Sequence, residues 1–327
     1  MEINYPPYTI TDKMLNLATS IMEKIGEANY FESLNIFPEL RKKTRIQSIH
    51  SSLAIENNQL SLFQVESVIN GKTVIGEQKD IQEVKNAYKA HEEIDNVNPY
   101  SVDDLKKIHG ILTFAIEDDC GKFRNHGEAV YDGDIQIFMA PPHRMVPTLM
   151  DNLFNWMNKV KEKVNPLILS SIFHYEFVFI HPFSDGNGRT ARLWQTAILA
   201  HWKDLFKYIP IESIIKKHQE EYYTTIQNCN NVGNSNEFIE FMLKVINEAI
   251  AGMILTSNQE TAQETTQKTT QEKIINLIKK NPAITQVELA KILNLTRDGI
   301  SYNIKILKEK GIIERVGSTK NGIWKLL

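Results

Sequence analysis

The run from His181 to Arg192 constrains this chain more than any other segment. It reads His-Pro-Phe-Ser-Asp-Gly-Asn-Gly-Arg-Thr-Ala-Arg. Two glycines flank Asn187, so the backbone can approach a ligand closely, and a helix beginning there would present unpaired N–H groups to an anion. On that helix Arg189 and Arg192, three residues apart, would lie near one another and offer planar guanidinium groups to phosphate oxygens.

The other polar residues of the run also suit phosphate chemistry. The imidazole of His181 titrates near neutral pH and can take a proton from a hydroxyl. Asp185 is a lone carboxylate beside the expected phosphates, which suits Mg²⁺, because this ion keeps most of its waters and uses substrate oxygens as further ligands. Phe183 is expected to lie in the core beneath the loop. The run therefore predicts a phosphate-binding site.

The order of these residues resembles the Fic family signature, His-x-Phe-x-Asp/Glu-Gly-Asn-Gly-Arg-x-x-Arg, with every fixed position matched. The resemblance implies transfer of AMP, or less often another phosphate-linked group, from a nucleotide to a protein hydroxyl. It implies that His181 is the general base and that Asp185 holds Mg²⁺. The phosphates would be bound by the backbones of Gly186, Asn187 and Gly188, by Arg189 (α and β) and by Arg192 (γ).

Two further segments resemble parts of the family's site. The pattern Tyr-Tyr-x-x-apolar-x-x-x-Asn is matched by Tyr222, Tyr223, Ile226 and Asn230, and it implies that Tyr223 and Asn230 lie on the adenine side. A short β-hairpin predicted at about Val130–Ala140 corresponds to the family's flap, which aligns a target segment by main-chain pairing. An ordinary surface hairpin is the alternative.

The segment Ser51–Asn57 resembles the inhibitory helix of autoregulated Fic proteins, Ser/Thr-x-x-x-Glu-Gly/Asn. Ser52 and Glu56 are one helical turn apart, so Glu56 would project from the helix end and pair with Arg192. Such a pair would occupy the guanidinium meant for the γ-phosphate. The resemblance therefore implies autoinhibition by Glu56.

Hydrophobic periodicity predicts a mainly α-helical fold. The pattern is helical from Thr11 to about Asn96, and the hairpin is the one exception before the C-terminal region. Further helices are expected at 101–113, 146–160, 165–180, from the motif to Trp202, 211–226 and 237–255. We expect an N-terminal helical region with the inhibitory helix, residues 1–96, and a Fic core, residues 97–255.

Residues 256–271 are rich in Thr, Gln and Glu, have no large apolar side chain and are predicted to be a linker. Residues 272–327 then form a separate module, with a helix at 272–280, a second opened by a Thr285–Glu288 capping box, a third at 296–310 and a hairpin. Three helices followed by two strands resemble a winged helix-turn-helix domain.

Charge is unevenly distributed along the chain. The formal net charge is −3, but residues 272–327 carry eleven Lys/Arg against five Asp/Glu. Only this module is therefore suited to a polyanion. On its third helix Ile300, Ile304 and Leu307 are expected to face inward, leaving Arg297, Ser301, Tyr302 and Lys305 outward. That composition suits a helix in a DNA major groove, with protein docking as the alternative.

Several classes are disfavoured by the sequence. Cys120 and Cys229 are far apart and lack metal-ligand spacing, which favours a reducing compartment, so we expect a cytoplasmic protein without a disulfide. The longest apolar run, Leu167–Ile180, is too short to span a bilayer and is expected to be a buried helix. The remaining histidines are expected to have structural roles, with His174 hydrogen-bonded in the core, and no zinc site is expected.

The sequence thus predicts a protein adenylyltransferase that uses ATP and Mg²⁺ to place AMP on a Ser, Thr or Tyr hydroxyl of a target protein. Two alternatives stay open: a DNA-binding regulator whose Fic core is a nucleotide sensor, and an enzyme whose net reaction is removal of AMP. A homodimer is left open as well.

Overall fold

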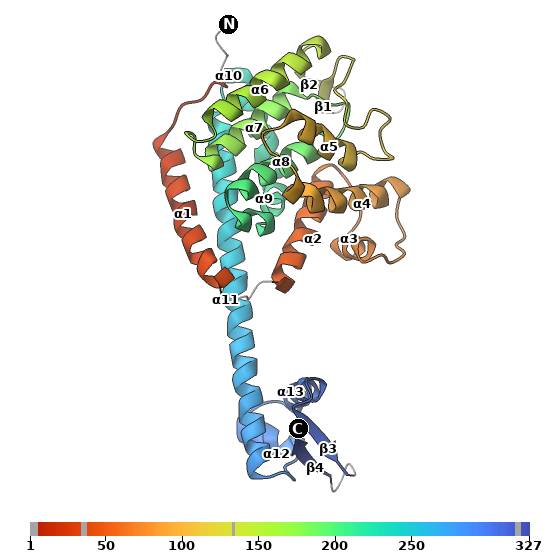
Figure 1. Cartoon of the computed structure of the whole chain (residues 1–327), viewed down its shortest axis with the longest axis vertical. Coiled ribbons are helices and arrows are strands. Elements are labelled where there is room, and N and C mark those ends of the chain that lie inside the picture. Colours follow the sequence, from red (N-terminus) through yellow and green to blue (C-terminus); the bar gives the residue numbers. More distant parts are fainter. Residues whose placement is uncertain (1–5, 34–37, 133–134, 318–321) are drawn as a thin grey trace. The chain divides into compact units, whose positions relative to one another are not determined.

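The computed structural model describes residues 6–33, 38–132, 135–317 and 322–327, and the side chains of residues 28–40, 129–138 and 257–269 lie outside that description (Figure 1). The chain divides into two compact units, Met1–Ile254 and Leu255–Leu327.

The first unit is helical apart from one hairpin. Its helices are α1 (Asp12–Ser33), α2 (Pro38–Ile55), α3 (Leu62–Ile69), α4 (Gln78–Glu93), α5 (Val102–Leu112), α6 (Val146–Val160), α7 (Pro166–Ile180), α8 (Asn187–Trp202), α9 (Ile211–Lys217), α10 (Gln219–Val232) and the first part of α11 (Asn236–Lys280). Short 3-10 helices are η1 (Ile94–Asn96), η2 (His143–Met145) and η3 (Asp204–Tyr208).

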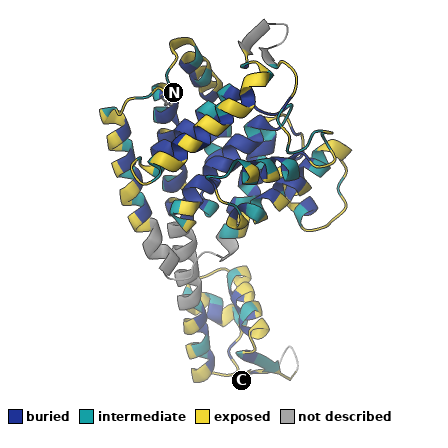
Figure 2. Cartoon of the chain, turned by 45° about the horizontal axis from the view of Figure 1, so that its top comes forward, coloured by how far each residue is buried: buried dark blue, intermediate teal, exposed yellow. Residues whose placement is uncertain are grey.

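Helix α7 is apolar on nearly every side and is buried along most of its length (Figure 2). It packs against α6 and α8, as expected for a helix without a polar face. Helix α8 is buried almost throughout although it carries Arg189 and Arg192. Buried charged groups require partners. These two arginines therefore indicate a polar site inside the first unit, beside the start of α8.

Several helix starts follow the local signals in the sequence. The Ser101 hydroxyl accepts the Asp104 N–H at 3.2 Å and caps α5, and the Asn165 side chain accepts the Leu167 N–H at 2.9 Å and caps α7. Helix α6 spans the residues predicted for it. The mainly helical fold predicted from periodicity is confirmed.

The helix predicted over residues 211–226 is in fact two helices. The break falls at His218, whose backbone leaves the helical region (φ −109°, ψ 35°), and α10 then runs on to Val232, where Gly233 ends it with φ +68°. Periodicity missed the break because no glycine or proline marks it.

The helix predicted to end at residue 255 continues to Lys280 as α11. The segment predicted as a linker, 256–271, therefore has a helical backbone, which its composition permits because it contains neither glycine nor proline. The separate helix expected at 272–280 is the end of α11. The domain boundaries drawn from the sequence stay predictions.

The predicted hairpin is present, with β1 (Ala129–Asp132) antiparallel to β2 (Ile135–Met139). Ala129 lies opposite Met139, and the register shifts between Val130 and Tyr131. Such a bulge bends and twists a strand pair locally. The turn residues 133–134 lie outside the described residues.

The second unit contains the end of α11, α12 (Gln286–Leu293), α13 (Arg297–Glu309), β3 (Ile313–Val316) and β4 (Ile323–Leu326). The Thr285–Glu288 capping box opens α12 as predicted. The Trp324 indole donates to the Ile284 carbonyl at 2.8 Å and ties the hairpin to the helices. The buried core residues of the second unit are Ile274, Ile278, Ile284, Leu289, Ile300, Ile304, Leu307, Ile313 and Trp324.

These features confirm the winged helix-turn-helix prediction for the second unit. Across the described ranges, no helix combines the length and apolar character needed to cross a bilayer.

Candidate active site

The predicted site is a tight turn between the two buried helices α7 and α8. His181 ends α7 in the left-handed region (φ +50°), and Gly186 opens α8 with φ +75°. A Cβ at Gly186 would lie 2.9 Å from the Thr113 Cγ2, so this position requires glycine for both its backbone angle and its surroundings.

The loop is locked by side chains that point into the core. The Asn187 carboxamide accepts the Phe183 N–H at 3.0 Å and donates to the Phe183 carbonyl at 2.8 Å. Phe183 is fully buried, as expected, and stacks on the His109 imidazole with ring centroids 3.6 Å apart. The side chain of Asn187 thus holds the loop in shape, and its backbone N–H belongs to the first turn of α8.

His109, which we expected to be an ordinary core histidine, supports the same loop. The Gly121 N–H donates to its Nδ1 at 3.0 Å, so the proton resides on Nε2, which donates to the Asp185 carbonyl at 2.9 Å. Burial lowers the pKa of His109 to about 4. A neutral imidazole of fixed tautomer therefore holds the backbone of Asp185.

A buried arginine holds the base of the turn. The Arg124 guanidinium donates to the carbonyls of His181 (2.7 Å), His126 (2.8 Å), Pro141 (2.6 Å) and Ile180 (3.4 Å). It lies between the turn and the chain that enters and leaves the hairpin. Burial lowers the pKa of Arg124 below its usual value. Arg124 thus fixes the backbone of His181 relative to the hairpin.

The imidazole of His181 is suited to accept a proton. Burial is the largest influence on it and lowers its pKa, and the nearby Glu128 and Glu56 carboxylates only partly oppose that effect. His181 is therefore neutral at physiological pH, the state in which an imidazole acts as a base.

Arg189 is held by two carboxylates. Its Nη1 donates to Glu83 at 2.9 Å and its Nη2 to Asp185 at 2.9 Å. Glu83, on α4, is buried and also accepts from the Asn58 carboxamide at 2.8 Å. Burial alone would raise the pKa of Asp185, but Arg189 and the Gly186 N–H outweigh it and the pKa lies below its usual value. Asp185 is thus an ionised carboxylate that pairs with the charged guanidinium of Arg189.

Arg192 meets the segment predicted to be inhibitory. Its Nε donates to the Ser52 hydroxyl at 3.0 Å, and its Nη2 donates to the Ser52 carbonyl and the Glu56 carboxylate, both at 2.9 Å. The Arg192 side chain is 1% exposed and that of Glu56 is 34% exposed. Its Nη1 is buried and has no hydrogen-bond partner among the described residues, so this N–H group is unsatisfied.

The Glu56 carboxylate also rests on the first turn of α8. A Cβ at Gly188 would collide with the Glu56 Oε1 and would lie 3.1 Å from the Arg192 Nη1. The N-terminus of a helix attracts anions through its free N–H groups and its dipole. Glu56 therefore occupies the place where the sequence predicts phosphate binding.

A cavity of about 790 Å³ brings most of the predicted residues together. Its wall includes Glu56, His181, Asn187, Gly188, Arg192, Tyr223 and Asn230. Asp185, Gly186 and Arg189 are not on this wall, and Arg189 pairs with both Asp185 and Glu83. The cavity therefore gathers most of the predicted residues, and the Asp185–Arg189 pair lies next to it in the same loop and helix start.

The far wall of the cavity comes from α10. Tyr223 is 46% exposed, whereas Tyr222 is buried and its hydroxyl lies 2.9 Å from the His174 Nε2. His174 is thus a hydrogen-bonded core residue, as predicted. The Asn230 carboxamide oxygen accepts the Tyr175 hydroxyl at 2.9 Å. Tyr222, Tyr223 and Asn230 all line the cavity, and the Tyr222 and Tyr223 rings pack edge to face with centroids 5.1 Å apart.

The residues present fit a single Mg²⁺ that is bound together with phosphates. The Asp185 side chain is 41% exposed, and its low pKa keeps it ionised. Within the described residues no group of three or more His, Cys, Asp or Glu side chains forms a metal cluster. One carboxylate with water and phosphate oxygens is a donor set that Mg²⁺ accepts.

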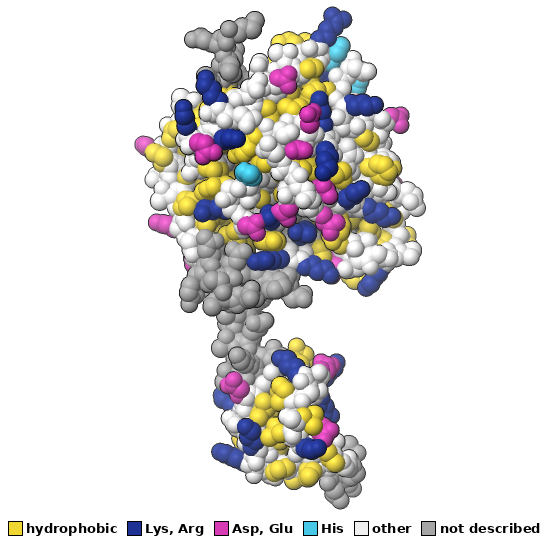
Figure 3. Space-filling model, viewed as in Figure 1, with side chains coloured by type: hydrophobic (Ala, Val, Ile, Leu, Met, Phe, Trp, Pro, Cys, Tyr) yellow, Lys and Arg dark blue, Asp and Glu magenta, His cyan; other side chains and the backbone are white. Residues whose placement is uncertain are grey.

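In the second unit, the outward face predicted for α13 is observed. Arg297, Ser301, Tyr302 and Lys305 are exposed, and Tyr302 is 59% exposed. Figure 3 shows Lys and Arg side chains on the visible face of this unit, with apolar side chains between them.

Sequence reasoning missed the residues that support the site from other elements. His109 and Arg124 bond to backbone carbonyls of the motif, Glu83 bonds to Arg189, and Asn58 bonds to Glu83. Only Glu83 left a signal, because it lies four residues before Ala87 and seven before Ala90 on one apolar helix face, where a charge needs a partner.

Comparison with known proteins agrees with this geometry. The Fic/DOC family model matches residues 99–199, and a model described as winged helix-turn-helix DNA-binding matches residues 267–314. The protein adenylyltransferase Fic of Aedes aegypti is 31% identical over 211 residues, which cover 62% of this chain and 40% of that protein. The protein adenylyltransferase fic-1 of Caenorhabditis elegans is 27% identical over 252 residues, which cover 72% of this chain and 46% of that protein.

The chain thus spans less than half the length of these two relatives. A solved structure matches it almost end to end. The crystal structure of a Fic family protein from Desulfovibrio desulfuricans G20 is 36% identical, covers 99% of this chain and 98% of its own, and superimposes with a TM-score of 0.77. The chain therefore belongs to the Fic family and carries a winged helix-turn-helix domain after its Fic domain.

Proposed function

We propose that this protein is a protein adenylyltransferase that transfers AMP from ATP to a Ser, Thr or Tyr hydroxyl and is held inactive by Glu56. One observation carries the proposal: a neutral histidine, a helix N-terminus and a buried arginine line one cavity, and a carboxylate occupies the anion position. The adenylyltransferase names of the relatives support the same reaction.

In the proposed reaction the target hydroxyl loses its proton to the imidazole of His181 as its oxygen attacks the α-phosphorus of ATP. The bond from the α-phosphorus to the oxygen bridging the β-phosphate breaks, pyrophosphate leaves and AMP stays on the target. The N–H groups at the start of α8 and the Arg192 guanidinium stabilise charge on the phosphates. Asp185 would hold Mg²⁺, which would further neutralise the phosphate charge.

Inhibition follows from competition for one guanidinium. The Glu56 carboxylate bonds to the Arg192 Nη2 and lies against Gly188. A triphosphate would have to place its negative charge beside this carboxylate and would lose a bond from Arg192. ATP therefore binds in an unproductive position, or not at all, while Glu56 stays in place.

Glu56→Gly tests the proposal. With α-labelled ATP we expect self-modification to rise by about tenfold or more, since a lost interaction of about 1.4 kcal/mol corresponds to a factor of ten. Mass spectrometry identifies AMP on the modified residue. Glu56→Gln separates loss of charge from loss of the side chain.

Arg192→Ala is the matched control. It is expected to be weak with or without Glu56, because the γ-phosphate then lacks its partner, and the two changes should be non-additive. Equal AMP incorporation by wild type and Glu56→Gly over a range of ATP concentrations would refute inhibition by Glu56. No AMP adduct in either protein, with ATP still bound, would favour a nucleotide-sensing role.

Net removal of AMP is a second candidate function, because Glu56 and His181 line the same cavity and a carboxylate there can orient a water. Incubating AMP-modified protein with wild type and with Glu56→Gly distinguishes the two. Loss of AMP only where Glu56 is present would favour removal as the physiological reaction.

A further inference from the structure

We propose that Lys216 and Gln219 are positioning residues that clamp the last turn of α2 and so hold Glu56 against Arg192. The inference rests on the proposed inhibition by Glu56 and names what keeps that residue in place.

The contacts of the Glu56 side chain hold its carboxylate but not the backbone that carries it. Within the described structure its ion pair is with the Arg192 Nη2, its carboxylate lies against Gly188, and its side chain is one-third exposed. The backbone leaves α2 at Ile55 and turns at Asn57 with φ +66°. The direction in which the Glu56 side chain leaves the helix end therefore depends on what holds this turn.

The end of a helix leaves carbonyl groups without intrahelical donors. The Lys216 ammonium donates to the Ala54 carbonyl at 2.8 Å, and the Gln219 carboxamide donates to the Ile55 carbonyl at 3.3 Å. The Ala54 carbonyl also accepts the Asn57 N–H at 3.3 Å. A positive charge at this end also offsets the negative pole of the α2 dipole.

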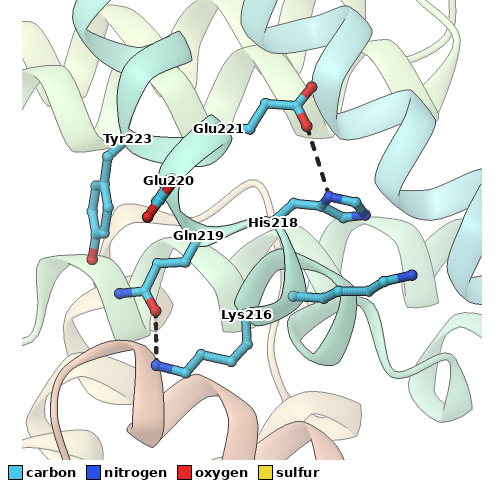
Figure 4. Close-up of a pocket in the computed structure, with 7 residues that line it drawn as sticks. Lys216, His218, Gln219, Glu220, Glu221 and Tyr223 are labelled. Atoms are coloured by element: carbon cyan, nitrogen blue, oxygen red, sulfur yellow. Dashed lines mark hydrogen bonds and ion pairs between the residues drawn. The ribbon is translucent and has the colours of Figure 1, made fainter.

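The two clamp residues support one another. Lys216 Nζ donates to the Gln219 Oε1 at 2.7 Å (Figure 4). They lie on either side of the break at His218, with Lys216 at the end of α9 and Gln219 at the start of α10. One turn earlier, the Ser51 and Ser213 hydroxyls are 3.0 Å apart and join α2 to α9.

Among the residues described, the ammonium group of Lys216 is not held by a carboxylate and can donate to the end of α2. No ion pair of Lys216 with a carboxylate is found in the described part of the chain, whereas its neighbour Lys217 pairs with Glu248. Figure 4 shows the Lys216 side chain directed toward Gln219. Lys216 also lies close enough to His50 to lower its pKa, after the larger effect of burial.

The clamp borders the nucleotide cavity. Gln219 lines the main cavity with Glu56 and Tyr223, and with Lys216 it lines a neighbouring hollow of about 600 Å³. Burial raises the pKa of Tyr223, and a hydrogen bond with Gln219 moderates this effect. The residue that holds α2 is thus also part of the wall expected to face the adenine.

Lys216→Met removes the donor and keeps most of the side-chain volume, and Gln219→Leu does the same for the carboxamide. We expect each to raise self-modification and ATP affinity, on the order of fivefold to tenfold, because hydrogen bonds from charged groups are among the stronger ones. Amide exchange at residues 53–58 should become faster. Lys216→Arg, which keeps the charge, should restore most of the inhibition.

The matched control is Lys217→Met, which removes an adjacent lysine that does not contact α2. It should leave ATP affinity and self-modification as in wild type. In a Glu56→Gly background, Lys216→Met, whose side chain is not on the main cavity wall, should change neither quantity by more than about twofold, because a positioning residue has no effect once the residue it positions is gone.

The outcomes separate the clamp from the inhibition. If Glu56→Gly activates and neither clamp variant does, the clamp is wrong and inhibition by Glu56 stands. If Lys216→Met acts equally with and without Glu56, it acts on the cavity directly and the clamp is again wrong. If Glu56→Gly has no effect, the proposed inhibition itself fails. Should Lys216→Met unfold, Lys216→Leu, which also removes the donor, gives the same test.

Discussion

At the scale of single residues, the polar groups of the motif divide into those that hold the loop and those that can meet a ligand. The Asn187 side chain is bonded to the loop backbone and Arg189 to Glu83 and Asp185. His181 and Arg192 line the cavity. This division predicts which substitutions change chemistry and which change binding.

His181→Ala tests that division. In the Glu56→Gly background it should lower AMP transfer by about 10²–10⁴-fold, the usual contribution of a general base. ATP affinity should change by only about a few-fold, because the anion position is formed by α8 and Arg192. Isothermal titration measures the affinity and label incorporation measures the transfer. Undiminished AMP adducts would remove His181 from the mechanism.

The residues of the motif could be predicted from sequence because they are consecutive and their spacing carries the chemistry. Glu56 and Ser52 were also found, since one helical turn separates them and their partner Arg192 was known. His109 and Arg124 could not be found. They act on backbone carbonyls of the turn, and backbone atoms leave no trace in the identity of the residues contacted.

At the scale of elements, the caps of α5 and α12 and the extents of α6 and α7 were predictable, because each depends on residues close in sequence. The break at His218 was not, since no glycine or proline marks it. This break carries the proposed clamp, so the feature that local rules missed is one on which the proposed regulation depends.

Arg124 joins the turn after α7 to the segments before and after the hairpin. We expect its replacement to change both stability and AMP transfer. Arg124→Met leaves four carbonyls without their donor, so we expect a lower Tm and AMP transfer reduced by about 10²-fold, the cost of misplacing a reactive group by about 1 Å. ATP affinity should fall less, because Arg124 is not on the cavity wall. Arg124→Lys should rescue only partly, since an ammonium cannot span the same carbonyls.

The exposed Arg144→Met serves as the control for loss of an arginine near the hairpin. It should leave transfer and Tm unchanged. Wild-type transfer by Arg124→Met with an unchanged Tm would show that the turn keeps its shape without the guanidinium.

At the scale of the whole molecule, the chain combines two units with different charge and separate cores. The catalytic residues all belong to the first unit, whereas the excess of Lys and Arg belongs to residues 272–327. We therefore expect the reaction and polyanion binding to be separable. A chain ending at residue 255 should retain the self-modification of its full-length counterpart in the Glu56→Gly background.

The full-length chain is expected to bind duplex DNA through α13, with an affinity that falls as salt rises, because binding to phosphates releases counterions. Replacing both Arg297 and Lys305 by Ala should weaken binding and reduce the salt slope by about one for each phosphate that is no longer neutralised. Lys13→Ala, which removes a lysine from the first unit, should have no effect. Fluorescence anisotropy over a salt series measures all three proteins. Binding that is absent, or that does not respond to salt, would instead assign the exposed face of α13 to a protein partner, and the loss of target modification in the shortened chain would then identify that partner as the substrate.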